Sequence, residues 1–199
     1  MLARNRKSIR LPGYDYSNPG AYFVTICVKD HTHLFGSIHN SVMRENEFAK
    51  IVRECWNDLP NHYPSVKLDA FVIMPNHIHG IIIILDDDHG VGAGLGVDVG
   101  AGFKPAPTTN TTNTNTPKRH GLSEIIRALK TFSARRINEI RKSPGVSVWQ
   151  RNFYEHIIRN ESALYQIRKY INANPANWQL HNENSISDEL DLVKTLTTF

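Results

Sequence analysis

Cysteine and long hydrophobic runs are both scarce in this sequence. Cys27 and Cys55 are the only cysteines, and neither belongs to a CxxC pair. That excludes a disulfide framework and a cysteine zinc site. The longest aliphatic run, Ile81 to Leu85, is too short to cross a bilayer, and residues 1–16 contain no apolar signal core. We therefore expect a protein of the reducing cytoplasm, with no membrane partner.

A strong charge imbalance is also missing, since the net charge is only +4. Hydrophobic residues make up 40% and charged residues 21% of the chain, as in globular proteins. The 199 residues are enough to bury a core without metal or disulfide staples. We predict a single domain over residues 1–199.

Periodicity and turn residues predict the order of strands and helices. Phe48, Ile51 and Cys55 have helical spacing, and Pro75-Asn76 favours a turn between two strands. The expected strands are 21–28, 66–74 and 77–85, the expected helices are 46–59, 122–142 and 161–174, with Pro175 ending the last, and 146–158 is an extended segment or fourth strand. This βαββ–αβα order favours an α+β, ferredoxin-like split βαβ sandwich with a mainly antiparallel sheet.

Three parts of the chain fall outside that pattern. Residues 87–117 are rich in Gly, Thr and Asn without periodicity, which predicts a flexible insertion. Residues 1–13 form a basic arm, and 179–199 carry no diagnostic motif.

In the helix expected at 122–142, one face is apolar, formed by Ile125, Ile126, Leu129, Phe132, Ile137 and Ile140.

A histidine pair, His77 and His79, lies in the most apolar part of the chain. Because side chains alternate along a strand, both imidazoles point to one face, roughly 7 Å apart, and Ile78 points to the other. Two neutral imidazoles can supply two ligands to a divalent ion. The alternative is a pair of buried histidines satisfied by protein partners. A second pair, His31 and His33, has the same spacing around a polar threonine, and we expect it at the surface.

The helix expected at 161–174 carries a possible partner for the histidines. Tyr170 and Asn174 are four residues apart, on a stripe next to the apolar one, so they project together from the edge of the core. A phenolate can attack phosphorus, and an amide oxygen can bind a hard cation. On helix geometry alone, a core-edge tyrosine and a helix-end asparagine remain the alternatives. Tyr154 is a rival nucleophile.

Three separated segments carry a family resemblance. They are His77-Ile-His79 after Met74-Pro-Asn, residues 149–159, and Tyr170-Ile-Asn-Ala-Asn-Pro175. Together they resemble the HUH single-tyrosine transposases, and more specifically the REP-associated tyrosine transposases, from about Gly13 to Trp178. The resemblance implies that His77, His79 and Asn174 hold Mg²⁺ or Mn²⁺. It also implies that Tyr170 cleaves single-stranded DNA and retains a 5′-phosphotyrosine, with Tyr154 in a packing or DNA-contact role.

Basic residues cluster where such a protein would bind DNA. Residues 118–142 contain eight basic and two acidic residues, a net charge of +6. A phosphate-tracking surface and an ordinary solvated helix face both fit this helix. The candidate DNA contacts are Arg4, Arg6, Lys7 and Arg10 in the basic arm, Arg127, Lys130 and Arg135 on the helix, and Arg151 near the site.

The resemblance implies single-stranded DNA with hairpins, of the REP palindrome type, as the partner. A monomer or homodimer associated with the nucleoid is expected. Two other functions are compatible with the residues. One is a basic hairpin-binding protein without strand transfer, and the other is a nuclease in which metal on His77 and His79 activates water.

Overall fold

The computed structural model describes residues 11, 13–86 and 120–178. The basic arm, including Arg4, Arg6, Lys7 and Arg10, lies outside the described residues, as do the segment 87–119 and the C-terminal residues 179–199. None of the helices within the described ranges is long and apolar enough to span a membrane.

A four-stranded antiparallel sheet forms the centre of the molecule. Its strands, in spatial order, are β4 (Val66–Ile73), β5 (His77–Ile84), β1 (Gly20–Cys27) and β6 (Tyr154–Ile158). Both β1 and β4 run antiparallel to β5, so they are parallel to each other with β5 between them. This is the split βαβ arrangement, and it confirms the α+β prediction.

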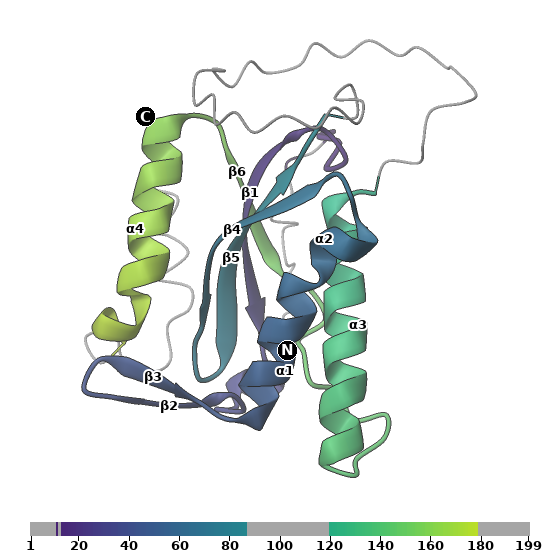
Figure 1. Ribbon diagram of the computed structural model, residues 1–199, viewed down its shortest axis with the longest axis vertical. Helices are drawn as coiled ribbons and strands as arrows, with labels where there is room; N and C mark the ends of the chain where they lie inside the picture. The colour runs from purple at the N-terminus through teal and green to yellow at the C-terminus, as the bar shows by residue number, and fades with distance from the viewer. Residues whose placement is uncertain (1–10, 12, 87–119, 179–199) are drawn as a thin grey trace, which may run out of the picture.

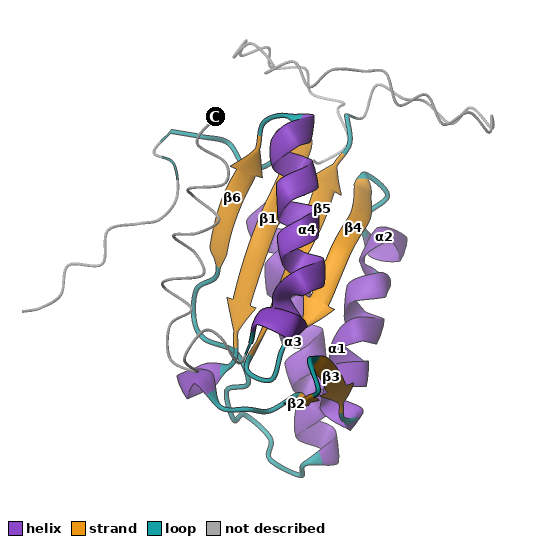
Figure 2. Cartoon of the chain, turned by 90° about the vertical axis from the view of Figure 1, so that its left-hand side faces the viewer, coloured by secondary structure: helices purple, strands orange, loops and turns teal. Residues whose placement is uncertain are grey.

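Helices cover both faces of the sheet (Figures 1 and 2). One face carries α1 (Glu47–Asn57), the short α2 (Leu59–His62) and α3 (Leu122–Ile140). The opposite face carries α4 (Glu161–Asn177) alone. A short hairpin of β2 (Gly36–His39) and β3 (Val42–Glu45) lies beyond the sheet, after the 3₁₀ turn η1 (Lys29–His31).

Asparagine side chains start two of the helices. The Asn46 Oδ1 atom accepts hydrogen bonds from the backbone N–H groups of Phe48 and Ala49 at the start of α1. Asn160 Oδ1 accepts from Ala163 N at the start of α4. These bonds satisfy N–H groups that have no partner within the helix. The helix predicted from residue 46 therefore begins one residue later, with Asn46 as its cap.

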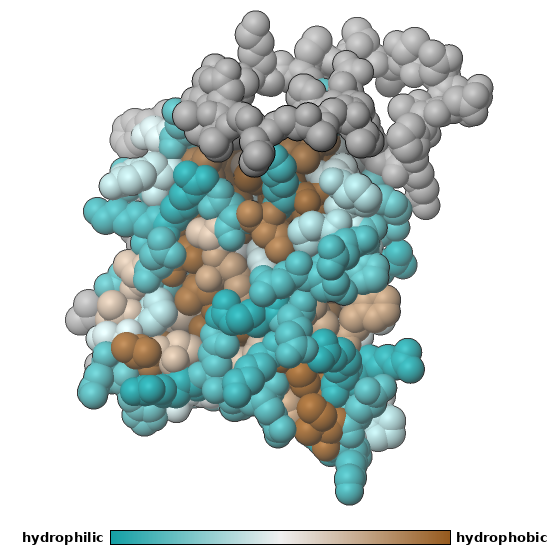
Figure 3. Space-filling view, viewed as in Figure 1, coloured by the Kyte–Doolittle hydropathy of each residue, from teal (hydrophilic) through white to brown (hydrophobic). Residues whose placement is uncertain are grey.

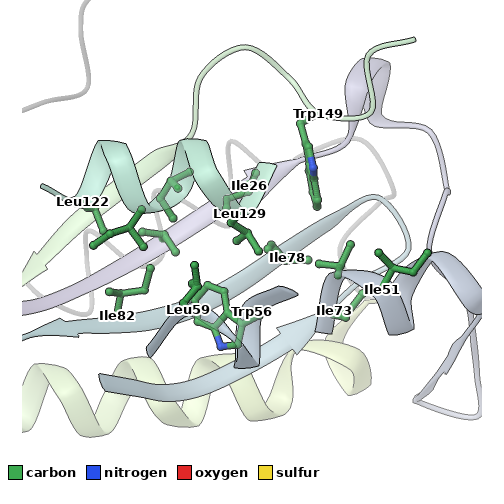
Figure 4. Close-up of a cluster of buried hydrophobic side chains, with 14 of the residues drawn as sticks. Ile26, Ile51, Trp56, Leu59, Ile73, Ile78, Ile82, Leu122, Leu129 and Trp149 are labelled. Atoms are coloured by element: carbon green, nitrogen blue, oxygen red, sulfur yellow. The ribbon is translucent and has the colours of Figure 1, made fainter. Parts of the chain in front are cut away.

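The main core lies between the sheet and the α1 and α3 helices (Figure 4). Trp56, Ile78, Ile82 and Leu129 are buried there. A second cluster lies beneath α4, where Ala21, Phe23, Ile81, Tyr154, Leu164, Ile167 and Ile171 pack together. Leu164, Ile167 and Ile171 are the apolar stripe that the helical spacing predicts. The pleat thus sends alternate residues of β5 into two different cores.

The prediction of an extended segment or fourth strand at 146–158 is confirmed: Trp149 makes a single bridge to Val28, and β6 begins at Tyr154. Three other local predictions need correction. Pro175 lies inside α4, which continues to Asn177. Phe132 and Ile140, expected on the buried face, are exposed, because Phe132 lies at the edge of the apolar stripe and Ile140 lies in the last turn of α3. On the face shown in Figure 3, hydrophilic residues predominate, and hydrophobic residues are visible in the centre and near the lower edge.

Gly80 gives β5 room beside a tryptophan. A Cβ atom added there would lie 2.4 Å from the Trp56 ring, which is itself stacked on Phe71 with centroids 4.4 Å apart. We expect Gly80→Ala to lower the free energy of unfolding by about 1–3 kcal/mol through overpacking, as measured by urea denaturation. The control is Gly121→Ala, where the nearest heavy atoms would be 3.8 Å away and no overpacking arises; because Gly121 is the N-cap of α3 and alanine is a poorer cap, the expected loss is about 0.5 kcal/mol. Equal losses in the two variants would contradict this explanation.

Candidate metal and tyrosine site

The two histidines face each other beneath α4. His77 and His79 lie opposite Cys27 and Thr25 of β1, and Ile78 between them points into the main core. Both imidazoles are fully buried. Their Nε2 atoms are 3.0 Å apart. The prediction that both side chains share one face of the strand is confirmed, and their Nε2 atoms converge.

Each Nδ1 atom has its own protein partner. His77 Nδ1 is 2.7 Å from Asn76 Oδ1, and because a carbonyl oxygen only accepts, the imidazole donates this hydrogen bond. His79 Nδ1 is 2.8 Å from the hydroxyl of Thr25. Asn76 and Thr25 are both buried. The Nδ1 atoms are thereby occupied, which directs both Nε2 atoms toward a shared space.

Tyr170 of α4 reaches the same space. Its hydroxyl oxygen is 3.3 Å from His79 Nε2, although the two residues are 91 positions apart in the sequence. The tyrosine ring packs at 5.3 Å from the His79 ring and at 6.1 Å, edge on, from Phe23. Phe23 also stacks on His79 at 5.4 Å. Phe23 therefore supports both rings from below.

Asn174 follows Tyr170 by one helical turn. Its side chain is 4% exposed, and its Oδ1 atom is buried with no hydrogen-bond partner among the described residues. An unsatisfied buried carbonyl oxygen is costly. A hard cation would be a suitable partner for it, since amide oxygens bind such ions.

These donors fit a divalent cation. Two ligands held about 2.1 Å from an octahedral ion, at a right angle to each other, are about 3.0 Å apart. The Nε2 atoms of His77 and His79 have that separation. The described residues contain no group of three or more His, Cys, Asp or Glu side chains that could hold a metal. Asn174, whose amide oxygen is buried one helical turn beyond Tyr170, is therefore the candidate for a third protein donor.

Burial lowers the pKa of His77 well below its usual value, and the neighbouring His79 and His31 lower it further. The folded, metal-free protein therefore keeps this imidazole neutral, whereas the unfolded chain protonates it near pH 6.5. We expect the free energy of unfolding to be retained above pH 6.5 and to fall as the pH drops below it.

Urea denaturation in the presence of a chelator, between pH 7.5 and 5, measures this dependence. His77→Gln should flatten the slope. His156, whose pKa is lowered first by burial and then by Arg159, should supply part of the remaining slope. The same slope in wild type and His77→Gln would contradict a buried neutral His77.

The second histidine pair lies at the surface, as predicted. His31 and His33 are both exposed. His31 Nε2 accepts a hydrogen bond of 2.7 Å from the Gln150 amide. His33 contacts Trp178 at 5.9 Å between ring centroids, and Trp178 contacts His77 at the same distance. Trp178 thus separates the two histidine pairs.

Sequence reasoning missed Trp178, Thr25 and Asn76 as neighbours of the site. A signal for Trp178 existed, because it continues the Tyr170 and Asn174 stripe by four more residues. The β2–β3 hairpin was missed as well. Its two turn residues, Asn40 and Ser41, have φ values of 50° and 63°, as a two-residue hairpin turn requires.

Tyr154, the rival nucleophile, lies in the core beneath α4. It is 6% exposed, and its ring packs edge on against Phe23 with centroids 6.3 Å apart. Tyr154 is paired with Thr25 across β1 and β6. The Tyr170 hydroxyl has a direct contact with a histidine Nε2.

The candidate DNA contacts have different environments. Arg127 and Arg151 are exposed, and Arg135 forms an exposed ion pair with Glu139. Lys130, expected to project from α3 into solvent, instead donates hydrogen bonds to the backbone carbonyls of Gln150, Arg151 and Asn152. Burial lowers its pKa. Lys130 therefore holds the segment that leads into β6, beside a cavity of about 450 Å³ that Arg127 and Arg151 also line.

No family model matches the sequence of this chain. A curated Haemophilus influenzae protein, described as an uncharacterized protein, is 41% identical over 176 residues, which cover 88% of this chain and 91% of the relative. The two proteins belong to one family.

Two further relatives carry a functional name. A Haemophilus influenzae protein described as a putative REP-associated tyrosine transposase is 25% identical over 161 residues, covering 81% of this chain and 73% of that protein. The solved structure of a REP-associated tyrosine transposase bound to a REP hairpin is matched over 84% of this chain and 73% of that one, with a TM-score of 0.52 and 17% identity. This chain has the fold of a REP-associated tyrosine transposase. The resemblance read from the three sequence segments is confirmed at the level of fold and distant sequence similarity.

Proposed function

We propose that this protein is a metal-dependent transposase of the REP-associated kind, which cleaves and rejoins single-stranded DNA at hairpin-containing sequences. The observation that carries the proposal is the convergence of three side-chain atoms. His79 Nε2 lies 3.0 Å from His77 Nε2 and 3.3 Å from Tyr170 Oη. A relative with the same fold is bound to a REP hairpin, which supports hairpin DNA as the substrate.

In the proposed reaction Tyr170 is the nucleophile. Its hydroxyl loses a proton to water, the Oη–P bond forms, and the bond from phosphorus to the 3′ oxygen breaks. The leaving oxygen takes a proton and becomes a free 3′-hydroxyl, while the protein retains the 5′-phosphate. Attack by a second 3′-hydroxyl on the phosphotyrosine then rejoins the DNA without ATP, because the ester conserves the energy of the broken bond.

His77, His79 and Asn174 would hold the cation, Mg²⁺ or Mn²⁺, next to the phosphate. When bound, the metal supplies charge stabilisation to the nonbridging oxygens of the phosphate. The residues of the chain perform the remaining tasks. Phe23 and the α4 packing hold the tyrosine ring, and Trp178 covers the His77 side.

The polarity of the covalent product tests the proposal. A hairpin-bearing single strand of REP type is labelled at either its 5′ or its 3′ end and incubated with the protein and Mn²⁺. A 5′-phosphotyrosine joins the protein to the 3′ fragment, so a denaturation-resistant labelled protein should appear with the 3′ label only. The 5′-labelled strand should release a free fragment ending in a 3′-hydroxyl.

Two other outcomes identify other functions. Retention of the hairpin in a gel shift, without cleavage of any strand, would indicate a DNA-binding protein that has lost strand transfer. Cleavage without an adduct from either label would indicate that water is the nucleophile.

A further inference from the structure

The Nδ1 atoms of His77 and His79 have different kinds of hydrogen-bond partner. Asn76 Oδ1 is a carbonyl oxygen, so it can only accept, and the bond of 2.7 Å fixes the proton of neutral His77 on Nδ1. The lone pair of His77 Nε2 then points into the site. Asn76 is buried at the turn between β4 and β5, and its backbone carbonyl also accepts from Val28 N at 2.8 Å. This second bond anchors the turn that carries the amide.

Thr25 offers His79 a reversible partner. A hydroxyl can donate or accept, so the 2.8 Å contact between Thr25 Oγ1 and His79 Nδ1 is compatible with either tautomer of His79. Thr25 is 1% exposed and lies on the central strand β1, with His79 on one side and Tyr154 on the other. Water has little access to replace this hydroxyl.

Without a cation, a proton shared between the two Nε2 atoms fits this geometry. Two bare Nε2 lone pairs at 3.0 Å would repel each other. If Thr25 donates to Nδ1, the His79 proton lies on Nε2, where His77 Nε2 at 3.0 Å and Tyr170 Oη at 3.3 Å can accept it. A bound cation requires the opposite arrangement, with both lone pairs directed at the metal and Thr25 accepting from Nδ1–H.

We propose that Asn76 and Thr25 are positioning residues for the metal site: Asn76 locks His77 in the ligand tautomer, and Thr25 lets His79 change tautomer when the cation enters. The inference rests on the proposed metal site but concerns binding of the ion by the protein alone. Neither residue touches the reacting atoms. They act by orienting the imidazoles that do.

The first test measures Mn²⁺ affinity in the absence of DNA, from the free Mn²⁺ signal in electron paramagnetic resonance. Thr25→Val keeps the shape but removes the hydroxyl, and we expect the affinity to fall about 10- to 100-fold. Thr25→Ser restores the hydroxyl and should recover affinity to within about 3-fold of wild type. Asn76→Ala should lose a similar amount, and Asn76→Asp, which keeps an acceptor oxygen, should not.

The second test reads the tautomers directly. In ¹⁵N spectra of histidine side chains, the proton of His79 should move from Nε2 to Nδ1 when Mg²⁺ alone is added, while that of His77 stays on Nδ1. Thr25→Val should still fold, with a cooperative thermal melt at a lower Tm because His79 Nδ1 loses the hydroxyl, and yet lose this shift.

Three results would overturn the inference: unchanged Mn²⁺ affinity in Thr25→Val, an equal loss in Thr25→Ser, or a His79 tautomer that is the same with and without Mg²⁺. Because none of these measurements uses DNA, they are separable from the proposed function. If the variants show the expected Mn²⁺ affinities but the protein forms no DNA adduct, the roles of Asn76 and Thr25 are supported and the proposed function is contradicted. If the protein forms the adduct but Thr25→Val does not change Mn²⁺ affinity, the proposed function is supported and the role of Thr25 is contradicted.

Discussion

Tyr170→Phe should abolish formation of the covalent adduct, with a loss of about 10³-fold or more, the scale expected when an enzyme loses its nucleophile. The substitution removes one oxygen atom and leaves the ring, which packs against Phe23 and His79. We therefore expect unchanged folding and unchanged hairpin binding. The measurement is the yield of labelled protein after incubation with 3′-labelled single-stranded DNA and Mn²⁺.

Tyr154→Phe is the matched control for that loss. Tyr154 is as buried as Tyr170 and contacts the same phenylalanine. Removal of its hydroxyl should leave the adduct yield within about 3-fold of wild type, since it is not the predicted nucleophile. The opposite pattern, with Tyr154→Phe inactive and Tyr170→Phe active, would exchange the roles of the two residues.

Removal of the metal should stop cleavage before it affects DNA binding. A chelator, or the substitution His79→Ala, takes away charge stabilisation at the scissile phosphate, and we expect cleavage to fall at least about 10²-fold. Hairpin binding should persist, because contacts to the phosphate backbone by basic side chains supply much of the affinity. Cleavage is followed by the release of labelled fragment, and binding by gel shift at constant salt.

The exposed pair supplies the control for His79→Ala. His33 belongs to the exposed His31-Thr-His33 pair, which has the same spacing as His77 and His79. His33→Ala should preserve the cleavage rate to within a few fold. Restoration of wild-type activity by Mn²⁺ after chelation should occur in His33→Ala and fail in His79→Ala. Full cleavage by His79→Ala in the presence of the chelator would exclude the proposed use of a metal.

The parts of the fold with strong local signals could be predicted from the sequence. Alternation placed His77 and His79 on one face, and helical spacing placed Tyr170 and Asn174 on one stripe, because these periods follow from backbone geometry alone. The convergence of the two pairs did not follow from either segment by itself. It depends on α4 crossing the sheet over β5, a tertiary contact between residues 91 positions apart, and only the family resemblance indicated it.

Side-chain partners were the hardest features to predict. Thr25 sits in a strand of apolar residues, where a threonine is unremarkable for β-structure, and its contact with His79 depends on the register of β1 against β5. Lys130 was expected to face solvent, but its long side chain reaches the carbonyls of a segment 20 residues away. Phe132 fits a buried helical stripe by spacing, yet it is 55% exposed and contacts His62 at the rim of a cavity of about 790 Å³.

The attachment site of the DNA tests the central claim most directly. After incubation with a hairpin-bearing single strand and Mn²⁺, the denatured adduct is digested with nuclease and protease, and the modified peptide is sequenced by mass spectrometry. The expected result is a single peptide that carries a 5′-linked nucleotide on Tyr170. A nucleotide on Tyr154 or on another residue, or cleaved DNA with no modified peptide, would contradict a Tyr170 nucleophile beside His77 and His79.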